Sequence, residues 1–251
     1  MDFSFPTLAG VSVLFFFVAI LYSSVGHGGA SGYLAVLSFF SIAPALMSST
    51  ALVLNVLVST TAFFAFYRAG HFSIGLVWPF LVTSVPSAFV GGAVQLPTKA
   101  YFLLLAGVLL FAACRLIMEI RAGRDEAFAR PPKLAVALPV GAGIGAVSGI
   151  VGVGGGIFLS PLILLKAWAG AKRTAAVSAL FILVNSLAGL SGRLYTGTFA
   201  LRELVPLLVA AFLGGIVGSR LGATRFSSLT LRRLLGVVLI LASLKLVVSF
   251  L

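Results

Sequence analysis

Long apolar stretches follow one another along almost the whole chain, separated by short polar or basic joints. Eight of them have about the 20 residues that an α-helix needs to cross a bilayer. They cover residues 7–24, 46–67, 72–94, 100–120, 134–150, 174–192, 203–222 and 229–250. Two shorter apolar pieces, 33–41 and 157–165, each follow a cluster of glycines. The pattern predicts an all-α polytopic membrane protein with eight long spans and two short half-helices.

Two glycine runs interrupt this pattern, Val25-Gly26-His27-Gly28-Gly29 and, 126 residues later, Val151-Gly152-Val153-Gly154-Gly155. Consecutive glycines weaken a helix, and lipid cannot satisfy the backbone N–H groups that a broken helix leaves unpaired. Such backbone is tolerated only inside the protein or beside a watery cavity, and paired breaks in two halves are typical of a transport site. We therefore expect the functional site at these two runs.

The two halves of the chain resemble each other. A shift of 127 residues matches Gly70-His71-Phe72 to Gly197-Thr198-Phe199, Pro79 to Pro206 and Gly91 to Gly218. Together with the glycine runs, these matches indicate an internal duplication. The sequence predicts a first repeat at residues 1–121, a cytoplasmic linker at 122–133 and a second repeat at 134–251. Each repeat holds a glycine-broken helix followed by three full spans.

Basic residues predict the orientation of the halves, because Lys and Arg collect in the cytoplasmic loops of membrane proteins. Five segments per half, an odd number, would invert the second half relative to the first. This arrangement places one set of basic residues inside, namely Arg68, Lys166, Lys172, Arg173, Arg220, Arg225, Arg232 and Arg233, and leaves Lys99, Arg193, Arg202 and Lys245 outside. A parallel arrangement with four segments in each half would place more of these basic residues outside. We predict an inverted repeat with both termini outside. If the two short pieces are re-entrant and do not span the membrane, the chain has eight membrane-spanning helices.

Composition excludes an ordinary soluble domain, because 61% of the residues are hydrophobic and 9% are charged. A net charge of +12 would suggest nucleic acid in a soluble protein. Here most basic residues flank apolar segments, so we interpret them as topology signals and expect a lipid bilayer, and no nucleic acid, as partner. The first residues lack the basic region of a cleavable signal. The single cysteine, Cys114, excludes an intrachain disulfide.

Acidic residues are scarce and stand away from the middle of every span. They are Asp2, Glu119, Asp125, Glu126 and Glu203. A cation carrier usually keeps a carboxylate at depth, so we expect an anion as substrate, with protons or sodium open as the coupling ion. The sequence offers no metal-ligand cluster and no catalytic Ser-His-Asp set, so we expect no metal, no cofactor and no enzymatic activity. The sequence leaves open whether the protein forms a homodimer.

Each glycine run precedes a helix whose first N–H groups and positive dipole end would attract an anion. The candidate substrate-binding residues are Ser24, Gly26, His27, Gly28, Gly29, Ser31, Gly32, Asn55, Ser148, Gly152, Gly154, Gly155, Gly156 and Asn185. Close helix packing is the alternative for the glycines, and bonding between helices is the alternative for the two asparagines. Packing is the better explanation for two further sets spaced by four, Gly141, Gly145 and Gly149, and Gly214, Gly218 and Gly222.

His27 is the one titratable residue within either run. An imidazole titrates near pH 6.5, so His27 is a candidate for proton coupling, although a lone histidine is more often a structural donor. The second run has Val153 at the equivalent place, so any such role is asymmetric.

The stretches Tyr22-Ser23-Ser24-Val25-Gly26-His27-Gly28-Gly29-Ala30-Ser31-Gly32-Tyr33 and Ser148-Gly149-Ile150-Val151-Gly152-Val153-Gly154-Gly155-Gly156 resemble the TauE/SafE sulfite exporter family, part of the wider 4-toluene sulfonate uptake permease group. The resemblance implies secondary transport of sulfite, sulfonates, sulfoacetate or related anions across a bacterial inner membrane, in either direction. We expect alternating access around a midplane anion site. A gated anion channel using the same site is the first alternative, and a membrane enzyme or assembly factor is the second.

Overall fold

The computed structural model describes residues 5–40, 42–117, 132–198, 205–224 and 229–250, which form ten α-helices and no strand. The first-half helices are α1 (Phe5–Ser23), α2 (Ala30–Ser38), α3 (Pro44–Arg68), α4 (Ile74–Ala93) and α5 (Thr98–Ile117). Those of the second half are α6 (Leu134–Val151), α7 (Gly156–Leu165), α8 (Ala171–Tyr195), α9 (Val205–Thr224) and α10 (Leu229–Phe250). The predicted all-α fold is confirmed for these residues.

Six of these helices, α3, α4, α5, α6, α8 and α9, are long and apolar enough to cross a membrane. They correspond to six of the eight predicted spans. In α1 and α10 the described apolar stretches are shorter, Thr7–Ser23 and Leu239–Ser249. The presence of eight long spans therefore stays a prediction. The six long apolar helices have the length and composition of a multi-pass membrane protein.

A short helix follows each glycine run, as the sequence predicts. Gly29 and Gly155 cap α2 and α7 in the left-handed conformation, with φ of 94° and 81°, which glycine adopts without the steric penalty of a side chain. The two helices have 9 and 10 residues. At a rise of about 1.5 Å per residue, neither reaches across a hydrocarbon core of about 30 Å. Both are half-helices that begin inside the bundle.

Glycines spaced by four bring pairs of helices into backbone contact. On α6, a Cβ atom added to Gly141, Gly145 or Gly149 would overlap the carbonyl oxygen of Phe80, Ser84 or Ala88 of α4, respectively. On α9, Gly214 and Gly218 approach the carbonyl oxygens of Phe16 and Ile20 of α1 in the same way, and Gly222 approaches that of Ser24 just after α1. The packing interpretation of these two sets is confirmed.

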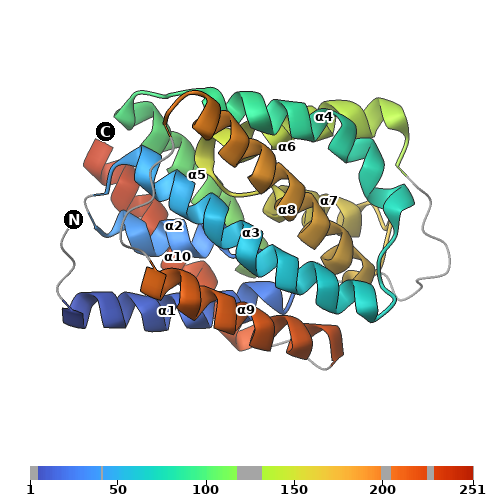
Figure 1. The fold of residues 1–251 in the computed structure, drawn as a ribbon, viewed down its shortest axis with the longest axis horizontal. Helices are drawn as coiled ribbons and strands as arrows, with labels where there is room; N and C mark the ends of the chain where they lie inside the picture. The colour runs from blue at the N-terminus through green and yellow to red at the C-terminus, as the bar shows by residue number, and fades with distance from the viewer. Residues whose placement is uncertain (1–4, 41, 118–131, 199–204, 225–228, 251) are drawn as a thin grey trace.

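The two halves exchange helices across the bundle. First-half α4 lies against second-half α6, and second-half α9 lies against first-half α1 (Figure 1). Between these pairs α3 and α8 run antiparallel. Leu52 near the start of α3 contacts Gly189 near the end of α8, while Phe66 near the end of α3 packs with Ala175 and Ala176 near the start of α8. The antiparallel pair forms the centre against which both glycine runs pack.

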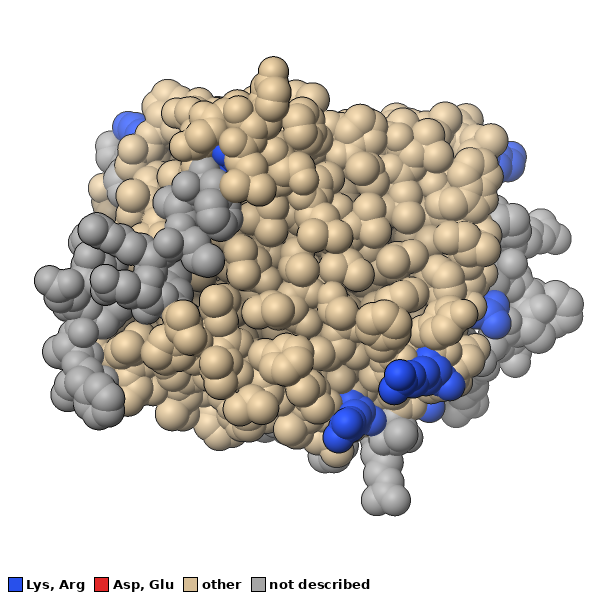
Figure 2. Space-filling view, viewed as in Figure 1, with Lys and Arg blue, Asp and Glu red and all other residues tan. Residues whose placement is uncertain are grey.

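Charged side chains stand at the margins of the bundle. On the face in Figure 2 the Lys and Arg side chains lie near the edge, most of them toward the right, and the broad middle shows none. All five acidic residues lie outside the described residues. So does the predicted linker at 122–133, apart from residues 132 and 133.

The glycine stripe on α6 generates a stability prediction. Gly145→Ala should lower the free energy of unfolding by about 1–3 kcal/mol, because the added methyl group would push α6 away from the Ser84 carbonyl. Gly143→Ala is the matched control, since a Cβ there meets nothing within 4 Å. Thermal unfolding of the purified proteins in detergent measures both. Equal transition temperatures would contradict the packing role of the stripe.

Candidate functional site

The first glycine run is pressed between α3 and α8. A Cβ atom on Gly26 would overlap the backbone of Ala175 of α8, and one on Gly28 would overlap the carboxamide of Asn55 of α3. Gly29 packs against the ring of Tyr33, whose buried hydroxyl has no hydrogen-bond partner among the described residues. The run therefore has no room for side chains, and its backbone lies directly beside Asn55.

The second run meets the same asparagine from the other half of the chain. A Cβ atom on Gly154 would lie 2.7 Å from Asn55 Nδ2 and 2.9 Å from Ser186 Oγ of α8. Gly152 packs against the backbone of Ser48 near the start of α3. Two further glycines are covered by apolar side chains, Gly155 by Ile144 and Phe181, and Gly156 by Ile182. Gly154 is thus the point of this run that faces polar atoms.

Asn55 connects the two runs. Its Oδ1 accepts a hydrogen bond of 3.2 Å from the N–H of Ala30, the first residue of α2. Its Nδ2 is fully buried and has no hydrogen-bond partner among the described residues, and the same holds for Ser186 Oγ. Buried donors are rarely left without an acceptor, and each one calls for an explanation. Two such donors beside Gly154 are suited to a ligand that supplies oxygen acceptors. We call this place, where Gly28, Gly154, Asn55 and Ser186 meet, the glycine junction.

His27 is hydrogen-bonded across the two halves. Its Nδ1 lies 3.0 Å from the carbonyl oxygen of Val25, and its Nε2 lies 3.1 Å from Ser160 Oγ of α7. Because a carbonyl only accepts, Nδ1 carries a hydrogen. Nε2 then accepts from Ser160 in the neutral ring and donates to it in the charged ring.

Ser160 has alternative partners that accommodate both states of the histidine. Its hydroxyl lies 2.9 Å from the carbonyl oxygen of Gly156 and 2.7 Å from Ser178 Oγ of α8. When Nε2 donates, the Ser160 proton can turn to Gly156 instead. The half-buried imidazole can therefore gain a proton without leaving a broken hydrogen bond at Ser160.

Five other predicted site residues have different surroundings. Ser24 Oγ, just after α1, donates to the carbonyl oxygen of Leu21 in the last turn of α1, and Ser31 Oγ pairs with Tyr22 of α1 at 2.6 Å. Gly32 packs against Val18 and Tyr22. Ser148 Oγ is buried without a partner among the described residues. Asn185 donates from Nδ2 to the Phe181 carbonyl one turn earlier in α8. The contacts of Ser24, Ser31, Gly32 and Asn185 are with their own or adjacent helices and not with the glycine junction.

Arg193 is a residue that the sequence indicated only as a charge at the end of a span. Its side chain is buried, and its Nη2 donates to the carbonyl oxygens of Gly149 and Ile150 at 3.0 and 2.9 Å. Tyr101 of α5 donates to the next carbonyl, that of Val151, at 3.2 Å. The two side chains cap the C-terminal end of α6 immediately before the second run, where a cation also favours the helix dipole. No local motif could reveal this role, because the partners are more than 40 residues apart.

A bundle of membrane-crossing helices, with two half-helices that begin at one buried polar point, is the architecture of a membrane transporter. The chain matches the family "Sulfite exporter TauE/SafE" over residues 11–246. It is also 38% identical over 242 residues to "Probable membrane transporter protein y4hK" of Sinorhizobium fredii (strain NBRC 101917 / NGR234), covering 94% of this chain and 97% of that protein. No solved structure matches the chain. The protein therefore belongs to the TauE/SafE sulfite exporter family of membrane transporters, as the glycine motifs indicated.

Proposed function

We propose that this protein is a secondary transporter of a small sulfur-containing anion, of the sulfite, sulfonate or sulfoacetate type, in a bacterial inner membrane. The glycine junction carries the proposal, because it presents two buried donors, Asn55 Nδ2 and Ser186 Oγ, that have no acceptor in the described part of the chain. The starts of α2 and α7 add partial positive charge beside them. An oxyanion supplies the oxygen acceptors and the negative charge that this environment lacks.

The antiparallel contact of α3 and α8 supports an inverted repeat. Gly26 packs against Ala175, and Gly152 packs against Ser48, which is the residue 127 positions before Ala175. Each run thus rests on the equivalent helix of the other half. α3 and α8 are equivalent helices of the two halves, and they run in opposite directions. A twofold axis that relates them therefore inverts the second half relative to the first.

Two interfaces that are equivalent under this repeat differ in how closely they pack. Between α4 and α8, Cβ atoms on Gly92 and Gly192 would overlap the backbones of Gly189 and Phe89, so the helices touch. The equivalent interface, between α3 and α9, contains a cleft of about 430 Å³. Alternating access requires that one of two equivalent interfaces is closed while the other is open. In the proposed cycle the halves rock so that the two interfaces exchange these states.

Counterflow in proteoliposomes tests the function. Vesicles loaded with unlabelled sulfite should accumulate labelled sulfite above its equilibrium level, because a carrier exchanges substrate at one site. Vesicles without the protein are the control. A flux that never saturates and shows no counterflow would indicate a gated anion channel at the same site. No flux of any sulfur oxyanion would contradict the proposal.

Removing an unpartnered hydroxyl tests the site. Ser186→Ala should raise the KM for the anion about tenfold, since a hydrogen bond to a charged group contributes about 1.5–3 kcal/mol. Stability should not fall, because this hydroxyl has no partner among the described residues. Ser84→Ala is the matched control, because Ser84 on α4 is another buried serine whose hydroxyl has no partner in the part of the chain that the structure describes, and it lies against the α6 glycine stripe. Equal KM values in the two variants would remove Ser186 from the site.

A pH profile tests His27 as the proton partner. Transport should be faster near pH 5.5 than near pH 7.5, because a charged imidazole adds attraction for the anion, and His27→Gln should flatten this difference. Another titratable ring, Tyr22, lies 6.4 Å away between ring centroids. His71→Gln, which changes the second histidine of the chain, is the control and should keep the slope. An unchanged profile in His27→Gln would make it a structural histidine.

A further inference from the structure

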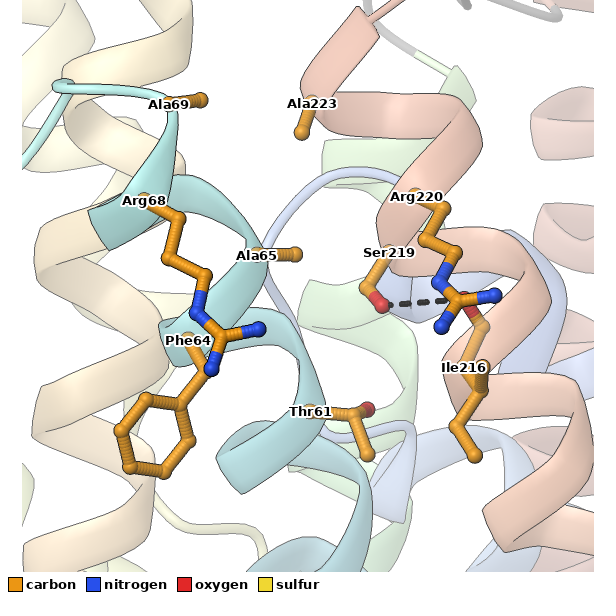
Figure 3. Close-up of a pocket in the computed structure, with 9 residues that line it drawn as sticks. All are labelled: Thr61, Phe64, Ala65, Arg68, Ala69, Ile216, Ser219, Arg220 and Ala223. Carbon is orange, nitrogen blue, oxygen red and sulfur yellow. Dashed lines mark hydrogen bonds between the residues drawn. The ribbon is translucent and has the colours of Figure 1, made fainter.

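The cleft between α3 and α9 has a charged rim and a wall of small residues. Its volume is about 430 Å³, within the range of small-molecule sites. Figure 3 shows Arg68 extending from α3 and Arg220 from α9 on either side of the gap, with Thr61 lower between them and Ile216 below Arg220. Two cationic side chains from different halves of the chain therefore line one opening.

Guanidinium groups are well suited to an oxyanion. Each offers a planar set of donors that matches two oxygens of a sulfonate, sulfate or phosphate group, and the charge persists at any physiological pH. A cleft with apolar walls excludes part of the screening water and so strengthens the attraction. Arg68 and Arg220 are exposed, which lets an anion reach them directly from solution.

The cleft borders a cluster of buried residues around Phe66 that also meets the first glycine run. Ala65 and Ala223 line the cleft, and both belong to the cluster that includes Ala175 and Ala176 of α8. The backbone of Ala175 is the surface against which Gly26 packs. The cleft and the first glycine run therefore border the same packed cluster.

We propose that the cleft between α3 and α9 is an oxyanion-binding vestibule, in which Arg68 and Arg220 together hold a tetrahedral oxyanion group. The occupant is either the transported anion on its way to or from the glycine junction or the phosphate group of a lipid. Binding of the transported anion in this cleft rests on the proposed function, whereas binding of an oxyanion in general does not.

Chemical protection measures binding without any transport. Phenylglyoxal modifies exposed arginines, and mass spectrometry of peptides gives the rate at each one. Sodium sulfate should slow modification of Arg68 and Arg220 several-fold relative to sodium chloride at equal ionic strength. Arg173, at the start of α8, is the internal control and should react at the same rate in both salts. In detergent without lipid, this result assigns the site to a free anion.

The lipid arm repeats the measurement with phosphatidylglycerol in place of sulfate. Protection by the lipid alone assigns the oxyanion to a lipid phosphate. Arg68→Gln should abolish the protection of Arg220 in either arm, because the proposal requires both side chains on one anion. Absence of protection in both arms, or full protection of Arg220 in Arg68→Gln, would overturn the vestibule.

A kinetic comparison connects the vestibule to transport. If the free anion is the occupant, Arg68→Gln should raise the KM for counterflow several-fold and leave the maximal rate unchanged. An unchanged KM would overturn passage of the substrate through the cleft. Protection without any counterflow in the unaltered protein would keep the binding site and contradict the proposed transport function, so the two failures are distinguishable.

Discussion

The contact of Asn55 with both glycine runs is the interaction on which the centre of this protein depends. One carboxamide accepts from the first N–H of α2 and places its Nδ2 against Gly154, just before α7. It reaches both runs because Gly28 and Gly154 have no side chains to hold it away. At bilayer depth no water or lipid can replace such a partner for broken backbone, so the asparagine joins the halves where each helix is interrupted.

Close helix contacts position this centre. The glycine stripes of α6 and α9 let α4 and α1 approach backbone to backbone, and these rigid pairs surround the α3–α8 core. The α4–α8 interface is closed by backbone contacts, whereas the equivalent interface between α3 and α9 contains a cleft. In the proposed cycle the packed pairs move as units, and the anion passes from the arginine pair to the unpartnered donors of the junction.

Individual residues show how far the sequence could predict the site. The short apolar pieces were predicted at residues 33–41 and 157–165, and the helices that contain them begin at Ala30 and Gly156, because a left-handed glycine cap starts each helix directly after its run. Asn185 was predicted as a substrate-binding residue together with Asn55. At the repeat shift of 127, however, the residue equivalent to Asn55 is Ile182, and Ile182 contacts Gly154 and Gly156. Asn185 bonds to its own helix instead.

The sequence by itself determined the membrane-crossing class, the places where helices break and the packing role of the glycine stripes. These properties follow from local apolar length, from consecutive glycines and from spacing by four, all of which neighbouring residues decide. Only the tertiary structure decided that Asn55 serves both runs, that Ser186 faces Gly154 and that Arg193 caps α6. These contacts join residues 25 to 99 positions apart, so they depend on how whole helices pack, which no local pattern of residues contains.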